Sequence, residues 1–382
     1  MDTAQLEANV ASIRRQIFQF FHNAAAYLAR RGIVDAPSND FAHASQADGE
    51  HLFRGELDVR MVNNFDWYRH LTVLDFLATV GRYARVNDML SRDSVKNRIT
   101  PIDKNAVAGL SFTEFSYQLM QAHDFSILHR APWHCSVQLG GSDQMGNINA
   151  GIDLIRRQRA AEAEGMGDPN MRQDPAYGLT LPLLTTASGA KFGKSAGNAV
   201  WISRDMLSDL DFYQYFVRSA DTNVERYLRS LTLLPANEID LVMSEHDGDK
   251  SKRVAQIRLA EEMTELVRGE EALRRAQVAT RVLFATDVRT LTLRQVQFAF
   301  ADDPRLVHTS RELLGDVLRV ATESKLVSSR SEARRLVQQG GLHVNGSAWR
   351  NTQEPLTDAE LLDGCFLVLR AGRTNHRVVV FT

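Results

Sequence analysis

The 382-residue sequence contains two cysteines, Cys135 and Cys365, and they lie far apart. So few cysteines indicate neither a disulfide framework nor a zinc site, which favours a reducing compartment and no protein-bound metal. The chain also lacks any run of 18 apolar residues, so no membrane span is expected. Its formal net charge is only −2, and any nucleic-acid-binding surface must therefore be a local patch.

The sequence is long enough for two or three domains, and its 44% apolar and 24% charged residues are typical of globular proteins. The first domain, predicted over 1–205, begins with an amphipathic helix over 3–30 and a polar loop over 35–56. A buried strand predicted at 135–139 precedes a glycine turn and a helix. This strand–turn–helix unit builds parallel sheets, so the first domain is predicted to be α/β. Further elements are predicted as a short strand with a turn over 58–68 and helices over 72–86 and 89–99.

The character of the sequence changes after residue 205. Helical patterns follow one another over 206–315, where glycine becomes scarcer and β-branched runs disappear, and this predicts an all-α domain. Over 320–382 a short helical segment precedes short strands separated by Asn-Gly and Ala-Gly turns, which predicts a small domain of mixed structure.

The helix predicted over 111–130 carries a polar stripe. Tyr117, Gln121 and Asp124 are spaced i, i+4 and i+7, which places them on one face. A phenol, an amide and a carboxylate in a row can hold an ammonium group and a hydroxyl at a fixed separation. The alternative is an ordinary solvated helix face. The helix also starts with the capping-box pair Ser111 and Glu114, and its apolar face is expected to consist of Phe112, Phe115, Leu119 and Met120.

The segment Gly-Gly-Ser-Asp-Gln at 140–144 follows the predicted strand at its carboxyl end, the edge of an open α/β sheet where ligands bind. Gly141 would let the backbone approach a ligand closely. Asp143 could accept a hydrogen bond from a ribose hydroxyl, and Gln144 could bind a carboxylate or amino group. The alternative is a tight turn in which Ser142 or Asp143 caps the next helix.

Residues 187–203, ASGAKFGKSAGNAVWIS, place Lys191 and Lys194 three apart between glycines. A P-loop is disfavoured, because it needs one more residue between its glycines and must lead directly into a helix. The second interpretation is a mobile loop whose lysines reach a polyphosphate. One ammonium about 4 Å from a phosphate charge contributes about 4 kcal/mol at an effective dielectric of about 20. An ordinary solvated turn is the third interpretation.

These segments together resemble tyrosyl-tRNA synthetases, a family of class I aminoacyl-tRNA synthetases. SFTEFSYQLMQAHDF, QLGGSDQMGNINAGIDLIRR and FGKSAGNAVWIS occur in that family's order, and KFGKS resembles its lysine signature loop. VNNFDWY, VNDMLSRDSVKNRI and FYQYFVRSADTNVERYLRSLTLLP extend the resemblance, which covers nearly the whole chain from about residue 58.

The resemblance implies activation of L-tyrosine by ATP to tyrosyl-adenylate and transfer of tyrosine to tRNA(Tyr), with Mg²⁺ arriving with ATP. In the implied tyrosine site, Tyr117 and Gln121 contact the α-amino group and Asp124 accepts from the phenolic hydroxyl. The tyrosine site implied in this way consists of Tyr117, Gln121, Asp124, Gln138 and Gln144. The implied ATP and adenylate site consists of Gly141, Asp143, Lys191, Lys194 and Ser195, and the two lysines are the catalytic pair that stabilises pyrophosphate.

The C-terminal part carries a basic cluster. Between Ser324 and Arg350, five basic residues accompany one acid, Glu332, for a local net charge of +4. The cluster resembles an S4-like RNA-binding module, and the alternative is a solvated helix face beside a hairpin. Its implied RNA-binding residues are Lys325, Arg330, Arg334 and Arg335. The helical region over 206–315 resembles an anticodon-binding domain. The resemblance also implies a homodimer in the mitochondrial matrix, with the cytoplasm as the alternative location.

The sequence departs from the family at one signature, because no histidine here is followed by x-Gly-His. The strand–helix half of the fold that carries this signature is also absent. We therefore expect an incomplete doubly wound, Rossmann-like parallel sheet that exposes apolar surface where its first strands would pair. Three interpretations remain: a fragment of a full enzyme, a chain completed by an N-terminal partner, or a non-catalytic relative that binds RNA. We predict that the chain alone does not form tyrosyl-adenylate.

Overall fold

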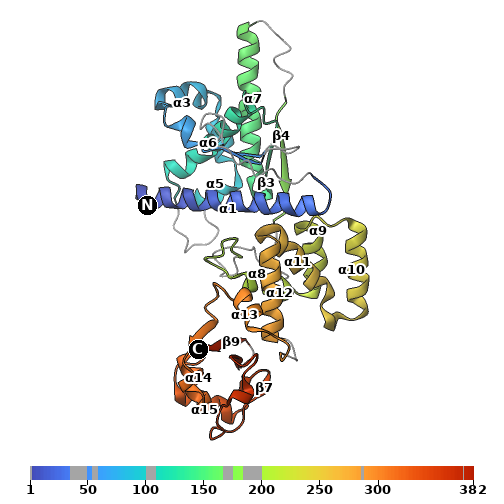
Figure 1. Cartoon of the computed structure of the whole chain (residues 1–382). Helices are drawn as coiled ribbons and strands as arrows, with labels where there is room; N and C mark the ends of the chain where they lie inside the picture. Colours follow the sequence, from blue (N-terminus) through green and yellow to red (C-terminus); the bar gives the residue numbers. More distant parts are fainter. Residues whose placement is uncertain are drawn as a thin grey trace. The chain divides into compact units, whose positions relative to one another are not determined.

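The computed structural model describes most of the chain, which forms two compact units (Figure 1). The described residues are 2–34, 50–53, 59–99, 109–166, 175–183, 200–284, 288–372 and 374–382. One unit contains helix α1 and the described residues from 200 onward, and the other contains those from 59 to 183. Within the described ranges, no helix is both long and apolar enough to cross a membrane.

Helix α1 spans Thr3–Arg30, as predicted. The Asp2 carboxylate accepts a hydrogen bond from the backbone N–H of Gln5 at 2.7 Å, which satisfies a donor that the helix start leaves free. The helix packs against α11 (Val254–Arg268). It therefore groups with the C-terminal unit rather than with the remainder of the expected domain over 1–205.

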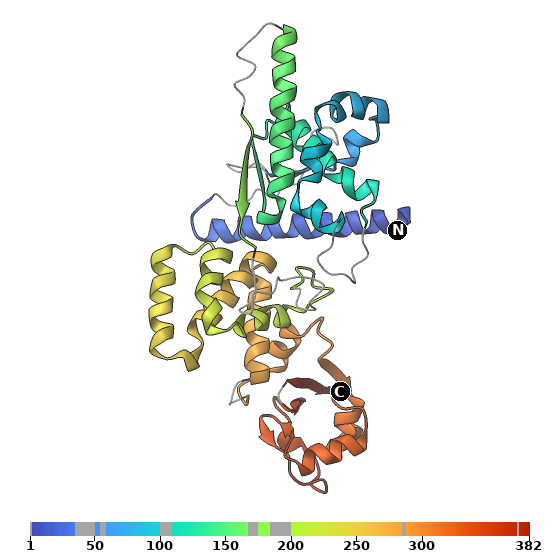
Figure 2. The ribbon, with the colours of Figure 1, turned by 180° about the vertical axis from the view of Figure 1, so that it is seen from behind.

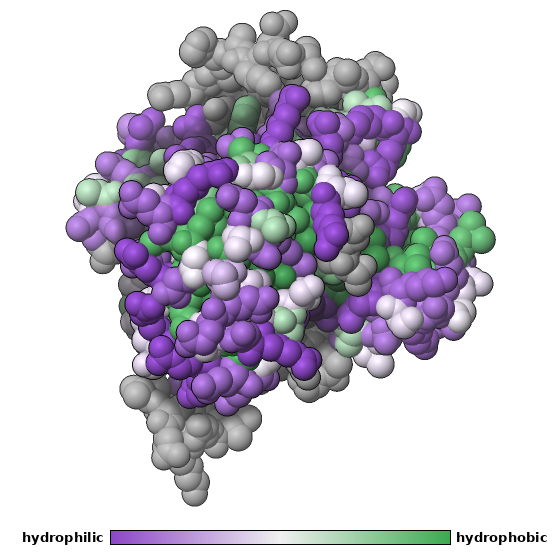
Figure 3. All heavy atoms as spheres, turned by 60° about the horizontal axis from the view of Figure 1, so that its bottom comes forward, coloured by the Kyte–Doolittle hydropathy of each residue, from purple (hydrophilic) through white to green (hydrophobic). Residues whose placement is uncertain are grey.

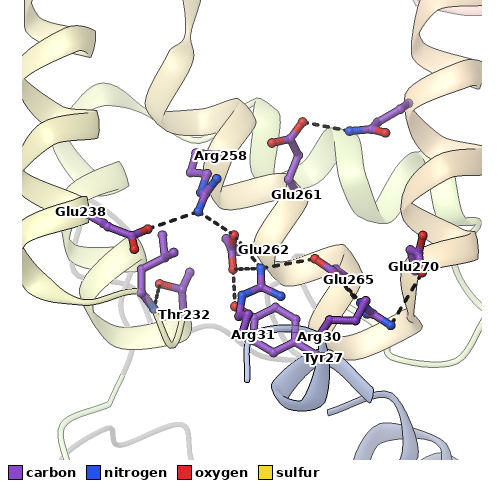
Figure 4. A network of polar contacts seen from close by, with 12 residues as sticks. Tyr27, Arg30, Arg31, Thr232, Glu238, Arg258, Glu261, Glu262, Glu265 and Glu270 are labelled. Carbon is purple, nitrogen blue, oxygen red and sulfur yellow. Dashed lines mark hydrogen bonds and ion pairs between the residues drawn. The ribbon is translucent and has the colours of Figure 1, made fainter. Parts of the chain in front are cut away.

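A buried polar network fixes the last turn of α1 to α11 (Figure 4). The Tyr27 hydroxyl donates to Glu262, and the Arg31 guanidinium lies over the Tyr27 ring at 3.5 Å from its centroid. Arg31 also pairs with Glu262 at 3.0 Å, and Arg30 pairs with Glu265 at 2.7 Å. Burial and the neighbouring Glu262 raise the pKa of Tyr27, so the phenol remains a donor. Because these acids share several donors, the network holds α1 in one orientation on α11.

The unit from 59 to 183 combines short helices and two long ones, α6 and α7, with a two-stranded sheet. Strands β3 and β4 run parallel, with Val137 opposite Tyr177 and Gly141 opposite Leu181. Helices α6 and α7 pack along each other, and α7 packs on the sheet. The elements are β2 (Val59–Met61), α2 (Phe65–Tyr68), α3 (Val73–Thr79), η2 (Gly81–Tyr83), α4 (Val86–Leu90), α5 (Asp93–Ile99), α6 (Phe112–His129), β3 (Val137–Gly141), η3 (Ser142–Gln144), α7 (Met145–Met166) and β4 (Tyr177–Leu181).

The sheet of β3 and β4 is covered on one face and open on the other. On the face towards α7, a Cβ added at Gly178 would meet Ile148 Cγ2 at 2.4 Å. On the opposite face Leu139 is 61% exposed and Leu179 is 54% exposed. The strand predicted at 135–139 is confirmed but begins two residues later, and the prediction that it is buried was wrong. This open face is unusual, because parallel sheets are ordinarily covered on both faces. The expected exposure at an edge where first strands would pair stays a prediction.

Several local predictions differ from the structure at the N-terminal side of this unit. Residues 50–53, expected within a polar loop, form strand β1 (Glu50–Phe53), which pairs with β2. The rest of 35–56 lies outside the described residues. The helix predicted over 72–86 ends at Thr79, because β-branched Val80 and then Gly81 weaken its continuation. The helix predicted over 89–99 is two helices, α4 and α5.

A helical layer follows from residue 209. Helices α8, α11 and α12 lie side by side in both ribbon views (Figures 1 and 2). Their apolar faces meet around Leu259 and Ala276, which are both 0% exposed. The helices are α8 (Asp209–Val217), α9 (Asp221–Leu231), α10 (Ala236–Gly248), η6 (Lys250–Lys252), α11, α12 (Glu270–Phe284) and α13 (Leu293–Ala299).

The C-terminal part forms a five-stranded sheet in the order β5-β9-β8-β6-β7. Strand β5 lies inside the region predicted to be all-α over 206–315, so that prediction was wrong for residues 306–309. Strand β5 forms because it pairs in parallel with β9, which begins nearly 70 residues later. A partner so distant in sequence leaves no local pattern from which the strand could be predicted. The elements are β5 (Leu306–Thr309), η7 (Arg311–Leu313), α14 (Val317–Glu323), α15 (Arg330–Gln338), β6 (Leu342–Val344), β7 (Ser347–Ala348), η8 (Asp358–Glu360), β8 (Phe366–Ala371) and β9 (Asn375–Phe381).

Both faces of this sheet are buried. Alternate residues of β8, Leu367 and Leu369, join a core with α14 and α15. Their neighbours Phe366 and Val368 join a second core with α12 and α13. The strand period of two therefore sends consecutive side chains into two different cores, which explains the uninterrupted apolar run.

Candidate active site and RNA-binding surface

Helix α6 begins with the predicted capping box. Ser111 Oγ accepts from the backbone N–H of Glu114 at 3.2 Å, and the Glu114 carboxylate accepts from the backbone N–H of Ser111 at 3.0 Å. Hydrogen bonds from the Ser111 backbone and hydroxyl lower the pKa of Glu114. The apolar face expected on this helix was partly wrong, because Phe112 is 81% exposed and Met120 is also exposed. The buried positions are instead Gln118, Ala122, His123, Phe125, Ser126 and His129.

The polar stripe lies at the surface of α6, with Tyr117 exposed and Gln121 and Asp124 half-buried. Asp124 is held in place from a neighbouring segment. Trp67 Nε1 donates to Asp124 Oδ1 at 2.9 Å, and Asn64 Nδ2 donates to Asp124 Oδ2 at 3.3 Å. A carboxylate offers about four acceptor sites, so each oxygen keeps capacity for a donor from a ligand.

Neutral aromatic neighbours surround Asp124. The Tyr68 hydroxyl donates to the backbone carbonyl of Met120 at 2.7 Å. Burial and the Asp124 carboxylate raise the pKa of Tyr68, so its hydroxyl stays protonated. Burial lowers the pKa of His123 from 6.5, and its ring packs against Tyr68 and Phe76. At neutral pH these neighbours are therefore uncharged beside the carboxylate.

The sequence pattern around Asn64 and Trp67 supports the family resemblance but assigns neither residue a role. Both lie about 60 positions before Asp124, so no helix or strand period links them to it. The local signal was an amide followed by aromatic residues, which fold into the short helix α2 beside α6. Buried or half-buried Trp N–H groups ordinarily find an acceptor, and here that acceptor is the stripe carboxylate.

The end of β3 closes tightly onto the start of α7. A Cβ added at Gly141 would lie 2.6 Å from Asp143 Oδ1, so a larger residue here would displace the Asp143 carboxylate. Gln144 Nε2 donates to Asp143 Oδ2 at 3.4 Å, and Asn147 Nδ2 donates to Gln144 Oε1 at 3.2 Å. Gln138 Oε1 is buried and has no donor among the described residues. A buried acceptor without a partner is uncommon, and it marks a place for a ligand donor or water.

The structure brings the predicted residues together only in part. Asp143 and Gln144 are in direct contact, and α6 packs on α7, whose start adjoins them. No hydrogen bond between described residues joins the α6 stripe to the turn at 140–144. Lys191, Lys194 and Ser195 lie outside the described residues, so their predicted place beside this site stays a prediction.

The predicted RNA-binding cluster lies on and beside α15. Ser329 Oγ accepts from the backbone N–H of Glu332 at 3.2 Å and caps the helix. Arg334 and Arg335 are exposed on α15, and Lys325 is exposed before it. Arg330 differs, because it forms an ion pair with Asp316. Hydrophilic residues cover most of the face shown in Figure 3, with apolar residues visible between them. All four residues are thus exposed, and three of them form no ion pair with the described residues.

The chain matches two family models. The model described as "tRNA synthetases class I (W and Y)" matches residues 3–285, and the model of the "Tyrosine--tRNA ligase SYY-like C-terminal domain" matches residues 295–379. A tyrosine–tRNA ligase of Levilactobacillus brevis is 38% identical over 327 residues, which cover 86% of this chain and 73% of the relative. One of Lactobacillus delbrueckii subsp. bulgaricus is 41% identical, covering 85% and 72%.

Solved structures give the same picture. A C-terminally truncated mitochondrial tyrosyl-tRNA synthetase of Aspergillus nidulans superposes with a TM-score of 0.56 at 32% identity. The matched region covers 73% of this chain and 70% of the Aspergillus chain. The corresponding protein of Coccidioides posadasii gives a TM-score of 0.55 at 36% identity, covering 72% and 68%.

Proposed function

The chain belongs to the tyrosyl-tRNA synthetase family of class I aminoacyl-tRNA synthetases, and from this premise we propose that it joins L-tyrosine to tRNA(Tyr). In the first step the tyrosine carboxylate attacks the α-phosphate of Mg²⁺-bound ATP, giving tyrosyl-adenylate and pyrophosphate. In the second step a hydroxyl at the 3′ end of the tRNA takes the tyrosyl group and AMP leaves. Neither step needs a covalent enzyme intermediate, so positioning and charge stabilisation do most of the work.

The observation that carries this proposal is the fixed carboxylate of Asp124. Trp67 and Asn64 hold it by hydrogen bonds of 2.9 and 3.3 Å, so its free acceptor sites have set directions. A tyrosine side chain reaching this point donates its phenolic hydroxyl, whereas phenylalanine leaves the carboxylate with an unpaired acceptor. Tyrosyl-tRNA synthetases are themselves the usual example of this discrimination.

The other predicted site residues are assigned to the remaining groups of tyrosine and ATP. Tyr117 and Gln121, two turns and one turn before Asp124 on α6, take the α-amino group of tyrosine. Gln138, whose buried oxygen has no described donor, also faces this ligand. The adenylate ribose donates to Asp143 where Gly141 lets the backbone approach. The pyrophosphate is assigned to Lys191, Lys194 and Ser195, and this assignment rests on the family resemblance.

Tyrosine binding tests the role of Asp124. We expect Asp124→Asn to weaken tyrosine binding by about tenfold to a hundredfold, because a hydrogen bond to a charged group contributes about 1.5–3 kcal/mol. Phenylalanine binding should hardly change, so the preference between the two amino acids collapses. Calorimetry with both amino acids measures this, and Asp75→Asn, on the surface of α3, serves as the control. Equal losses for tyrosine and phenylalanine would contradict the role.

Tyrosine-dependent ATP–pyrophosphate exchange by the purified chain tests the first step directly. The missing His-x-Gly-His signature predicts that the chain alone shows no exchange, and exchange would overturn that prediction. A non-catalytic RNA-binding relative would show neither exchange nor tyrosine heat. Tyrosine binding without exchange would assign this chain a tyrosine site that needs a further catalytic segment.

RNA binding falls to the α15 cluster in this proposal. Exposed Lys325, Arg334 and Arg335 lie against tRNA phosphates, while Arg330 is engaged by Asp316 and serves mainly to fix α15. The helical layer contacts the anticodon arm. Replacing any one of the three exposed cations by a neutral residue should reduce the salt dependence of binding, which filter binding at several salt concentrations measures.

A second copy of the chain is the proposed partner of the unit from 59 to 183. Helix α3 exposes Val73 by 75% and Leu74 by 78%, and Phe112 at the start of α6 is also exposed. Apolar side chains exposed this strongly mark interaction surfaces when they gather. Sedimentation of the purified chain tests the dimer. We place the protein in the mitochondrial matrix, because the two fungal relatives are mitochondrial synthetases by name. The cytoplasm is the alternative, and cell fractionation distinguishes the two.

A further inference from the structure

A polar cavity of about 270 Å³ lies within the unit that contains α1. Its walls come from the middle of α1, from residues 202–205 and from the last residues of α11. Three arginines line it, namely Arg15, Arg204 and Arg268. None of these residues belongs to the tyrosine site, to the adenylate turn or to the α15 cluster. The cavity therefore needs an explanation of its own.

The deepest arginine is held through both terminal nitrogens, whereas its Nε is unpaired among the described residues. The Arg268 side chain is 1% exposed, and its Nη1 donates to Asp209 Oδ1 at 3.0 Å. Its Nη2 donates to the backbone carbonyl of Trp201 at 3.0 Å. Among the described residues its Nε has no acceptor. Burial lowers the pKa of Arg268, but a guanidinium remains charged at neutral pH.

The charges around the cavity do not cancel. Arg204 Nε lies 3.3 Å from the same Asp209 oxygen, so one carboxylate serves two guanidinium groups. Arg15 forms no ion pair with the residues that the structure describes. Asp205 also lines the cavity, and it too forms no ion pair there. Among the described residues, these three cations face two carboxylates, Asp205 and Asp209, which leaves one excess positive charge beside the unpaired Asp205.

An unpaired arginine beside an unpaired carboxylate favours a ligand that carries both an anionic group and a hydrogen-bond donor. Arginine is the side chain best suited to phosphate, because its planar donors match two oxygens at once. A bare phosphate would meet repulsion from Asp205, which can only accept hydrogen bonds. A ligand that carries a hydroxyl donor next to its phosphate turns that repulsion into a hydrogen bond. A ribose-phosphate unit has this arrangement, and its 2′-hydroxyl distinguishes RNA from DNA.

We propose that this cavity binds a ribose-phosphate unit of the tRNA backbone, with the phosphate at Arg15 and a ribose hydroxyl at Asp205. The proposal rests on the proposed function, because that function supplies the RNA. A free nucleotide also carries a ribose next to a phosphate, so the experiment tests tRNA and a nucleotide separately. Arg15 lies on the exposed side of α1, and its replacement is not expected to disturb folding.

Salt-dependent binding of tRNA(Tyr) to the full chain tests the proposal. We expect Arg15→Gln to lower the slope of log affinity against log salt by about 0.7–0.9, the contribution of one phosphate contact, and to weaken binding by about threefold at low salt. The matched control is Arg14→Gln, because Arg14 is the neighbouring arginine on α1 and does not line the cavity. Unchanged binding by Arg15→Gln, or an equal reduction in both variants, overturns the proposal.

The ribose contact and the source of the ligand are tested separately. Asp205→Ala removes the acceptor for the ribose hydroxyl and should therefore lower the ratio of the affinity for the tRNA to that for a DNA of the same sequence. Binding of AMP by calorimetry forms the second arm. If Arg15→Gln weakens AMP binding and leaves tRNA binding intact, the occupant is a free nucleotide and the RNA assignment fails. If the wild-type chain does not bind tRNA(Tyr) at all, the proposed function fails, and the AMP arm still reports whether the cavity takes a ribose-phosphate.

Discussion

The β3–β4 sheet and the five-stranded C-terminal sheet use similar apolar residues but bury them very differently. Leu369 in β8 is 0% exposed, whereas Leu139 in β3 is 61% exposed. Helices pack on both faces of the five-stranded sheet, through its two cores. For β3 and β4, α7 covers one face among the described residues. An apolar strand is therefore buried only where a second layer exists to cover it.

Truncating one leucine in each sheet tests most directly whether this difference in burial produces a difference in stability. We expect Leu369→Ala to lower the free energy of unfolding of the C-terminal sheet by about 3 kcal/mol, because it opens a cavity in a closed core. Leu179→Ala, on the open face of β4, should cost less than about 1 kcal/mol. Hydrogen exchange of the β8 and β4 amides in the full chain measures both. Similar losses of stability at the two sites would mean that the open face of β4 is covered in solution.

The covered face of β4 should respond in the opposite way, since it has no spare room. A Cβ at Gly178 would lie 2.4 Å from Ile148 Cγ2, so Gly178→Ala should lower the stability of the β4–α7 packing by about 2 kcal/mol. In an Ile148→Ala background the same change should cost far less. Hydrogen exchange of β4 in the single and double variants gives the coupling. No reduction in the double variant would rule out the steric explanation.

A matched glycine in the C-terminal sheet separates crowding from backbone strain. Gly372 follows β8 at φ 66°, and a Cβ there would meet no atom within 4 Å. Gly372→Ala should therefore cost about 1 kcal/mol, from the left-handed backbone alone. Removing neighbouring side chains should not rescue it, in contrast to Gly178→Ala.

Patterns within one element could be predicted from the sequence. The capping box of α6, the i, i+4, i+7 stripe and the turn at Asn345 and Gly346 depend on neighbours a few residues away. The turn is formed by two successive residues with positive φ, the conformation that Asn-Gly favours between paired strands. Residue type and spacing alone are sufficient to predict local features of this kind.

Contacts between distant segments could not be predicted in this way. Strand β5 pairs with β9 across about 70 residues, and Trp67 reaches Asp124 across 57. Arg330 pairs with Asp316 from 14 residues away, while its predicted contact with RNA stays a prediction. In each case the partner is brought near by packing of whole elements, for which a sequence pattern gives no distance.

Two buried histidines, one in each unit, give the smallest expected effect and the sharpest contrast. His376 in β9 is 2% exposed, and its Nδ1–H donates to the backbone carbonyl of Thr374 at 3.0 Å. Burial lowers the pKa of His376, and nearby arginines lower it further. Burial also lowers the pKa of His123 in α6, but there the adjacent Asp124 carboxylate opposes the shift.

The sign of the pH effect follows from which state binds the proton first. With the pKa of His376 depressed in the folded state, the unfolded chain takes up a proton first as pH falls below about 6.5. The C-terminal sheet should therefore keep this stability above about pH 6.5 and lose it as the pH falls from there to the lower folded-state pKa. His376→Asn keeps a donor for Thr374 but cannot titrate, so the exchange protection of β9 should become less dependent on pH.

The same replacement at His123 should flatten the pH profile of α6 less, because Asp124 already offsets part of the pKa shift. A β9 profile that stays equally steep in His376→Asn would assign the pH dependence to carboxylates instead.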